Sequence, residues 1–118
     1  VQVTEPLRPK NILDECFKKV IRSKLDTCFA AYAQHKNFWY FKKNKLIRLS
    51  KYLDRKKPRQ SKNPILREDT GLALVTKSYF LRKGERIGKK VSCISYDDPK
   101  YSIDINNLQD LKIARKIY

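Results

Sequence analysis

The residues best suited to chemistry in this sequence are lysines and arginines, and they are concentrated in its middle. Between Lys36 and Arg67 there is a single acidic residue, Asp54. The basic residues of this segment are Lys36, Lys42, Lys43, Lys45, Arg48, Lys51, Arg55, Lys56, Lys57, Arg59, Lys62 and Arg67. The whole chain of 118 residues has a formal net charge of +16, and most of that excess lies here. Because such a charge increases self-repulsion in the folded state, it predicts a polyanionic partner, nucleic acid first of all.

The chemistry expected of this basic segment is contact with the phosphate backbone. Each basic side chain that neutralises a phosphate releases counterions, so binding should depend steeply on salt. Reading of base edges is not expected, since the sequence has no zinc-finger spacing and no glycine for a helix-turn-helix before Gly71. The segment also contains four consecutive aromatic residues, Phe38, Trp39, Tyr40 and Phe41. They could stack on the bases of a single strand, but we expect them to belong to the core.

Residue types used in catalysis are sparse and not spaced for it. His35 is the only histidine, and no serine or cysteine is placed to form a triad with it. Asp97 and Asp98 precede Pro99, where a turn is expected rather than an acid pair or a metal site. A Walker loop and a dinucleotide-binding glycine motif are both absent from the sequence. These patterns predict a non-catalytic protein with no metal and no cofactor.

The three cysteines, Cys16, Cys28 and Cys93, form no C-x-x-C pair. We expect them to be small buried hydrophobic residues in a reducing compartment, without disulfide or zinc. If one helix carried both Cys16 and Cys28, they would lie about 18 Å apart. No apolar run approaches the roughly 20 residues of a membrane helix, and residues 1–10 show no signal-peptide pattern. An intracellular protein is expected, in the nucleus by preference because basic clusters direct nuclear import, or in mitochondria.

One stretch resembles a known family. The run from Gly71 to Val75, followed by Lys83-Gly84-Glu85-Arg86-Ile87, is similar to the opening of a SET domain, in which a G-x-G-type strand precedes a K-G-E-x-I turn. The resemblance implies a lysine methyltransferase whose opening strand, here Gly71, Leu72 and Ala73, contacts S-adenosylmethionine through its backbone. The preceding Phe41-Lys42-Lys43-Asn44-Lys45 loosely resembles the helical region before the SET core of Suv4-20-type histone H4 methyltransferases.

The sequence also departs from that family. Ala73 stands where the second glycine belongs, and neither the N-H-S/C motif nor the catalytic tyrosine region is found before Tyr118. If the resemblance reflects common ancestry, a fragment or a degenerate relative is expected. A turn between two strands explains the K-G-E motif equally well.

The elements that must position the basic segment differ between the two halves of a single domain. Residues 1–10 are expected to be a tail, since Pro6 and Pro9 block regular structure. Apolar residues at three- and four-residue steps predict a helix over 11–34, and a less regular stripe predicts a second over 37–53. These two helices make 11–53 the helical region. Residues 54–70 form a polar, basic connector that could extend the second helix as an arm.

The remaining residues, 71–118, are expected to be rich in strands. Short runs of strand-forming residues occupy Leu72–Val75, Tyr79–Leu81, Lys90–Tyr96 and Tyr101–Ile105. Asn107, with Asp110 three residues later, predicts a cap for a last helix ending at Tyr118. The fold class is therefore α+β, with a helical half followed by a small antiparallel sheet and a short terminal helix.

Three functions remain open at this stage. The first is a non-catalytic nucleic-acid or chromatin binder that contacts phosphates through the basic helix and arm. The second is an RNA-binding component of a ribonucleoprotein, such as a ribosomal or mitochondrial ribosomal protein. The third is a fragment or degenerate form of a SET-type lysine methyltransferase, which alone would bind S-adenosylmethionine.

Overall fold

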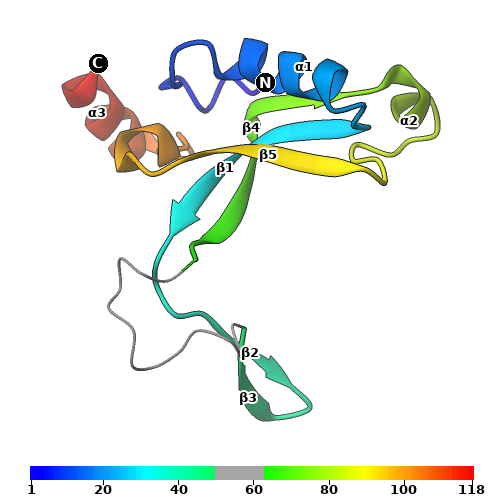
Figure 1. Cartoon of the computed structure of the whole chain (residues 1–118). Helices are drawn as coiled ribbons and strands as arrows, with labels where there is room; N and C mark the ends of the chain where they lie inside the picture. The colour runs from blue at the N-terminus through cyan, green and yellow to red at the C-terminus, as the bar shows by residue number, and fades with distance from the viewer. Residues whose placement is uncertain (50–62) are drawn as a thin grey trace.

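The computed structural model describes residues 1–49 and 63–118 (Figure 1). The elements are α1 (Ile12–Arg22), β1 (Thr27–Gln34), β2 (Trp39–Lys42), β3 (Lys45–Arg48), β4 (Ile65–Thr76), α2 (Ser78–Arg82), β5 (Val91–Tyr96), the 3-10 helix η2 (Pro99–Ser102) and α3 (Leu108–Ile117). The expected α+β class is confirmed. The expected division into a helical half and a β half is not, because strands occupy much of the first fifty residues.

A three-stranded sheet of order β4-β1-β5 forms the body of the protein. The central strand β1 pairs antiparallel with β4 and parallel with β5, so the expectation of a purely antiparallel sheet was wrong. Pairing with β5 ends at Tyr32, whereas pairing with β4 continues to Gln34 opposite Ile65. The β1–β4 ladder therefore runs beyond the third strand as a two-stranded arm, visible in Figure 1.

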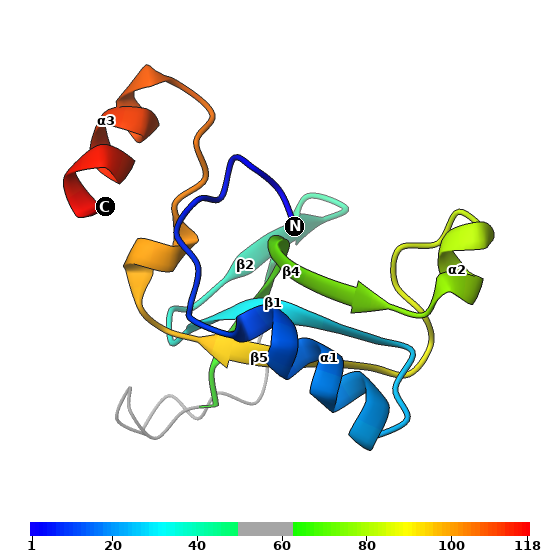
Figure 2. The same ribbon diagram turned by 90° about the horizontal axis from the view of Figure 1, so that it is seen from above.

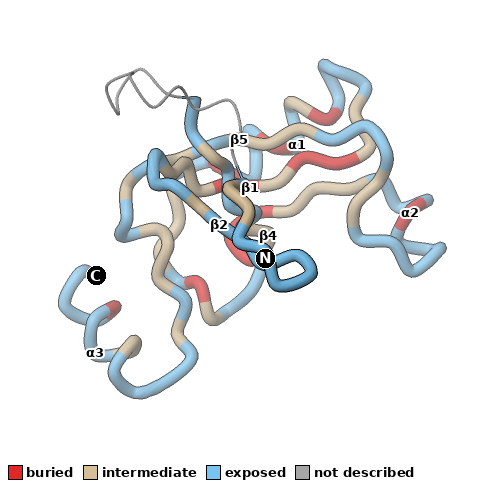
Figure 3. Tube along the Cα trace, turned by 90° about the horizontal axis from the view of Figure 1, so that it is seen from below, coloured by how far each residue is buried: buried red, intermediate tan, exposed pale blue. Residues whose placement is uncertain are grey.

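Helix α1 lies across one face of this sheet (Figure 2). Its residues Ile12, Cys16 and Val20 recur every four positions, so they share one side of the helix, and all three are buried. They pack in one cluster with residues of β1 and β4, among them Cys28 and Leu72. Figure 3 shows the buried residues gathered between α1 and the strands. The predicted helix is confirmed over this range, but of its expected apolar stripe only Cys16 and Val20 are buried, whereas Leu13, Phe17 and Ile21 are exposed.

The predicted helix over 11–34 was wrong beyond Arg22. The chain turns at Ser23 and Lys24, where Lys24 has φ 50°, and then enters β1. Cys28, Ala30 and Ala31 are all fully buried, so this central strand lacks the alternation that identifies a half-buried strand. The apolar residues of β1 therefore continue the spacing expected of a helix, although they lie in a strand. The expected separation of Cys16 and Cys28 also fails, because the two thiols approach each other between α1 and β1.

The second predicted helix, over 37–53, was also wrong where the structure describes it. Residues 39–48 form the antiparallel pair β2–β3, and residues 50–53 lie outside the described part of the chain. Residues 54–62 of the predicted connector lie outside it as well, and β4 begins at Ile65 within the remainder.

Predictions for the second half were correct in part. Leu72–Val75 lies in β4, Lys90–Tyr96 matches β5, and α3 is capped by Asn107, whose side chain accepts hydrogen bonds from two backbone N–H groups. Tyr79–Leu81 was predicted as a strand but lies in the short helix α2. Tyr101–Ile105 was also predicted as a strand but begins in η2 and continues without strand pairing.

The first ten residues are not a free tail. The backbone N–H of Gln2 donates to the carbonyl of Gly71 at 2.7 Å, and that of Ile105 donates to the carbonyl of Thr4 at 2.8 Å. Directly after the second contact, Glu5 is only 8% exposed. The N-terminal segment therefore connects β4 to the chain that precedes α3.

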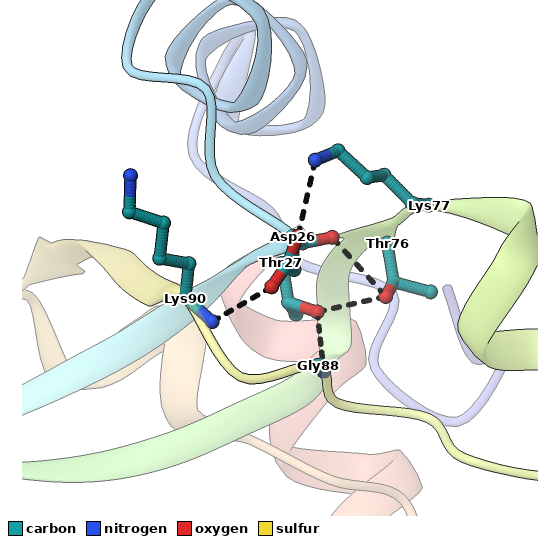
Figure 4. A network of polar contacts seen from close by, with 6 residues as sticks. All are labelled: Asp26, Thr27, Thr76, Lys77, Gly88 and Lys90. Carbon is teal, nitrogen blue, oxygen red and sulfur yellow. Dashed lines mark hydrogen bonds and ion pairs between the residues drawn. The ribbon is translucent and has the colours of Figure 1, made fainter.

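A network of polar contacts joins the strand ends beside α2 (Figure 4). The carboxylate of Asp26 accepts from the backbone N–H of Lys90 at 2.9 Å and from Nζ of Lys77 at 3.0 Å. These two contacts, the backbone donor first, hold the pKa of Asp26 below its usual value. Asp26 thereby ties the start of β1 to the ends of β4 and β5.

The hydroxyl of Thr27 lies at the centre of the same network, and its residue is fully buried. It accepts from the backbone N–H of Gly88 at 2.8 Å and shares a hydrogen bond with the Thr76 hydroxyl at 2.7 Å. Gly88 has no room for a side chain, since a Cβ would lie 2.5 Å from Cβ of Asp26. The polar network is thus closely packed at Gly88, and each of its members has a hydrogen-bond partner within it.

Candidate nucleic-acid interface

The hairpin β2–β3 carries four of the six described basic residues of the segment: Lys42, Lys43, Lys45 and Arg48. Aromatic and branched residues, which fit the pleated surface of a strand, flank Lys43-Asn44 on both sides. Lys43 and Asn44 have φ angles of 47° and 59°, as a two-residue type I′ turn requires. Lys42 pairs with Lys45 across this turn, and Trp39 pairs with Arg48 at the other end. The local sequence therefore closes a tight hairpin.

This hairpin stands apart from the body. It forms a two-stranded sheet of its own, and Figure 1 shows it beyond the end of the β1–β4 arm, on the side away from the helices. All four residues of β2 are exposed. Figure 3 likewise shows this region in the colour of exposed residues. The hairpin thus projects into solvent beyond the β1–β4 ladder, which is the longest ladder among the described residues.

The charge of the hairpin and its flanks is entirely positive. Residues 35–49 contain no aspartate or glutamate. They contain five basic residues: Lys36, Lys42, Lys43, Lys45 and Arg48. The four lysines are exposed. Lys42 and Lys45 lie directly opposite each other, an unfavourable arrangement for like charges that an anion between them would relieve.

Arg48 is held in place, unlike the lysines. Its guanidinium donates to the side-chain oxygen of Asn37 and lies 5.8 Å from the centre of the Trp39 ring. Its Nε is buried and has no partner among the described residues. A fixed, partly unsatisfied guanidinium beside an aromatic ring is suited to binding an anion or the face of a planar group.

The other predicted contact residues are not part of this hairpin. Arg67 lies on β4, where it forms an ion pair with Asp69 at 3.1 Å and lies over the Tyr32 ring. Its positive charge is therefore compensated locally. Six further residues were predicted to bind and lie outside the described ranges: Lys51, Arg55, Lys56, Lys57, Arg59 and Lys62.

The aromatic residues of the hairpin were expected in the core, and that expectation was wrong. Trp39, Tyr40 and Phe41 are all exposed, and only Phe38 is half-buried. The signal that was missed is the sequence around Lys43-Asn44, since asparagine between two strand-forming runs marks a hairpin turn. Trp39 and Phe41 stay exposed because the hairpin protrudes from the body and does not reach its buried core.

The residues implied by the SET resemblance lie on β4. Leu72 and Ala73 are fully buried in the core. Gly71 lies against the carboxyl group of Glu5, where a Cβ would be 1.9 Å from Oε1. The contact with S-adenosylmethionine stays a prediction.

The Glu5 carboxyl group is the most perturbed acid of the body. Burial, followed by the charges of Asp69 and Asp104, raises its pKa to about 7. Its Oε2 atom is buried without a hydrogen-bond partner among the described residues. Asp69 is engaged by the Tyr96 hydroxyl and by Arg67. This acidic group is thus part of how the N-terminal segment packs on β4.

The cysteines are free thiols, as expected. Burial raises the pKa of Cys16 to about 12 and also raises that of Cys28. Cys93 is only half-buried. Asp98 caps η2, accepting from the backbone N–H of Lys100 at 3.0 Å, so the chain turns in a 3-10 helix that begins at Pro99 and not at Asp97 and Asp98 before it.

The comparisons with known proteins name no family for this chain. No protein-family model matches the sequence, and no curated protein matches it significantly. Over residues 1–49 and 63–118, no helix is long and apolar enough to cross a membrane. The same residues contain no group of three or more histidine, cysteine, aspartate or glutamate side chains that could hold a metal ion.

Proposed function

We propose that this protein binds nucleic acid by contacting the phosphate backbone with its basic β2–β3 hairpin. The observation that carries the proposal is a protruding, exposed hairpin with five basic residues in and beside it and no acid over residues 35–49. The sequence alone placed these lysines on a helix. The hairpin replaces that helix, and the proposed chemistry is unchanged.

The distribution of charge supports a partner rather than a surface that is merely soluble. Three basic side chains of the body form ion pairs with acids: Lys77 with Asp26, Lys100 with Asp98, and Arg67 with Asp69. At the hairpin tip Lys42, Lys43 and Lys45 lie within four residues of one another with no acid nearby in sequence. A phosphate backbone is the common biological ligand that supplies closely spaced negative charges.

The setting of such a partner remains part of the proposal. Chromatin would provide it in the nucleus, and a ribosomal or mitochondrial ribosomal assembly would provide it as folded RNA. The two settings differ in whether duplex DNA alone is sufficient for binding.

The test is a salt titration of affinity for duplex DNA, single-stranded DNA and RNA. The variant changes Lys42, Lys43 and Lys45 to glutamine. Each lost phosphate contact should reduce the slope of log affinity against log salt by about 0.9 on duplex DNA and about 0.7 on a single strand. Affinity at low salt should fall in parallel.

A matched control removes the same charge from the body. Lys18, Lys112 and Lys116 are exposed on α1 and α3, and their change to glutamine lowers the net charge equally. Only the hairpin variant should lose slope. Equal losses in both variants would mean that binding depends on total charge, and no binding by the unchanged protein would refute the function itself.

A further inference from the structure

The two faces of the β2–β3 hairpin differ in chemistry. Side chains alternate along a strand, so Trp39 and Phe41 share one face. Directly opposite them on β3 are Arg48 and Leu46, which complete that face. The other face carries Tyr40 with Ile47, and Lys42 with Lys45. One side is therefore aromatic and apolar with a single guanidinium, and the other is half basic.

The aromatic face has little cover. Phe41 is 76% exposed, Leu46 is 55% exposed and Trp39 is 51% exposed. An isolated two-stranded hairpin is at best marginally stable in water, and leaving large apolar side chains exposed on it gains nothing for folding. Among the described residues nothing covers this face, and the hairpin points away from the body (Figure 1), so the face could contact a partner.

The charge around the face defines what that partner can be. Five basic residues and no acid surround it in sequence, which disfavours a basic or neutral protein surface and favours an anion. Among anionic ligands, nucleic acid also offers flat apolar surfaces, the faces of its bases. Aromatic side chains set within a basic surface are the usual platform for unpaired bases.

The same face is poorly suited to reading a duplex. A β-ribbon fits the major groove, but base edges are recognised there by side chains that donate and accept hydrogen bonds. Of the four residues on this face, only Arg48 is of a type that commonly donates hydrogen bonds to base edges. Its guanidinium already donates to the side-chain oxygen of Asn37. Trp39 and Phe41 are about 6.6 Å apart along the strand, roughly twice the 3.4 Å spacing of stacked bases, so an unstacked strand fits them better.

Resting on the proposed function, we propose that Trp39 and Phe41 stack on unpaired bases of single-stranded nucleic acid. Arg48 extends the platform beside Trp39, and Lys42, Lys43 and Lys45 hold the phosphates at the tip. Stacking needs no particular base, so pyrimidine and purine strands should both bind. The ligand class is therefore a single strand, or an unpaired loop within a folded RNA.

The experiment uses the fluorescence of Trp39, which is the only tryptophan of the chain. The full chain is titrated with oligothymidylate, with oligouridylate and with a duplex of equal phosphate number. Both single strands should quench Trp39 and bind the unchanged protein more tightly than the duplex does. Phe41→Ala should weaken single-strand binding about 5- to 150-fold, the range for one lost stacking contact, and leave duplex binding and its salt slope unchanged.

Two further variants separate stacking from folding and from general apolar contact. Phe41→Leu keeps an apolar strand residue without a ring, so it should lose nearly as much single-strand affinity as Phe41→Ala. Tyr79→Ala removes an aromatic residue that is 56% exposed on α2, and it should change nothing. Circular dichroism of each variant confirms that the hairpin variants remain folded.

The outcomes distinguish the two proposals. If Phe41→Leu binds single strands as well as the unchanged protein, or if the duplex quenches Trp39 equally, stacking is overturned while backbone binding stands. If the Phe41 variants convert a dimer to a monomer, the face binds a second copy of the chain and the inference is wrong. If no nucleic acid binds at all, both proposals fail.

Discussion

The three-stranded body and the β2–β3 hairpin both contain strands with apolar residues, but these residues are buried in the body and exposed in the hairpin. In the body, β1 lies between two strands and under α1, so Cys28 and Ala30 are fully buried. In the hairpin, Trp39 and Phe41 are exposed, and the described residues place no third strand beside β2 and β3. The acids are divided in the same way: residues 35–49 contain none, and the three ion pairs of the described residues all lie in the body. The buried core and the proposed binding surface are therefore located in separate parts of the chain.

The largest effect that this comparison predicts is on core packing. Leu72 is the largest fully buried side chain, and its change to alanine should lower the free energy of unfolding by about 2–5 kcal/mol. Leu46→Ala makes the same chemical change on the exposed hairpin and should cost less than about 0.5 kcal/mol. Urea denaturation of both variants measures the difference. Equal losses would show that the hairpin is part of one cooperative core.

The next effect concerns pH and the N-terminal segment. The folded pKa of Glu5, about 7, lies above its ordinary value of 4.5. Below pH 4.5 the carboxyl group is protonated in both states. Between pH 4.5 and 7 only the unfolded chain releases the proton, so the free energy of unfolding should fall as pH rises, by at most about 3 kcal/mol.

Glu5→Gln should remove that part of the pH dependence. Denaturant midpoints measured from pH 4 to 8 would show a flatter curve for this variant than for the unchanged protein. Glu85→Gln, at an exposed position, is the matched control and should leave the curve as it is. If the free energy of unfolding of Glu5→Gln falls with pH as much as that of the unchanged protein, another group causes the fall. Binding by the hairpin should not follow the Glu5 titration.

A smaller effect is expected where the strand ends meet. Thr27→Val keeps the shape of the side chain but leaves the backbone N–H of Gly88 without its acceptor. A buried, unsatisfied donor costs about 1–3 kcal/mol. Thr76→Val removes a hydroxyl from the same network at a half-buried position and should cost less. Thermal unfolding of the two variants tests the order, and a more damaging Thr76→Val would contradict it.

The sequence predicted the parts of the fold that depend on local patterns. Apolar residues at three- and four-residue steps, among them Cys16 and Val20, located α1, and Asn107 located the start of α3, since both signals arise within a few helical turns. The strand β1 was missed because it is buried on both faces and shows no alternation. Its parallel pairing with β5, more than sixty residues away, has no local signal at all.

The sequence predicted which residues give the candidate site its charge, but it did not predict that they lie on a hairpin. Composition alone identified Lys42, Lys43 and Lys45 as unopposed, because a count of charges needs no structure. Whether the neighbouring Trp39 and Phe41 face inward or outward depends on which elements cover them, and that is decided by tertiary packing. A cluster of aromatic residues usually indicates a buried core. The prediction fails for a hairpin whose aromatic face packs against no other described element.

The smallest expected change in the stability of the body comes from a substitution at the hairpin turn. It tests whether the hairpin folds independently of the body. Asn44, at φ 59°, tolerates the left-handed conformation, whereas alanine there should weaken the hairpin by about 1 kcal/mol and glycine should preserve it. Because the hairpin is a separate two-stranded sheet, Asn44→Ala should leave the thermal unfolding of the body unchanged. It should nevertheless reduce affinity for single strands by up to about fivefold, since part of the population would lack the platform. Asn44→Gly should bind like the unchanged protein. If Asn44→Ala lowers the melting temperature of the body, or binds as well as Asn44→Gly, then the hairpin is not the independent binding element that its exposure indicates.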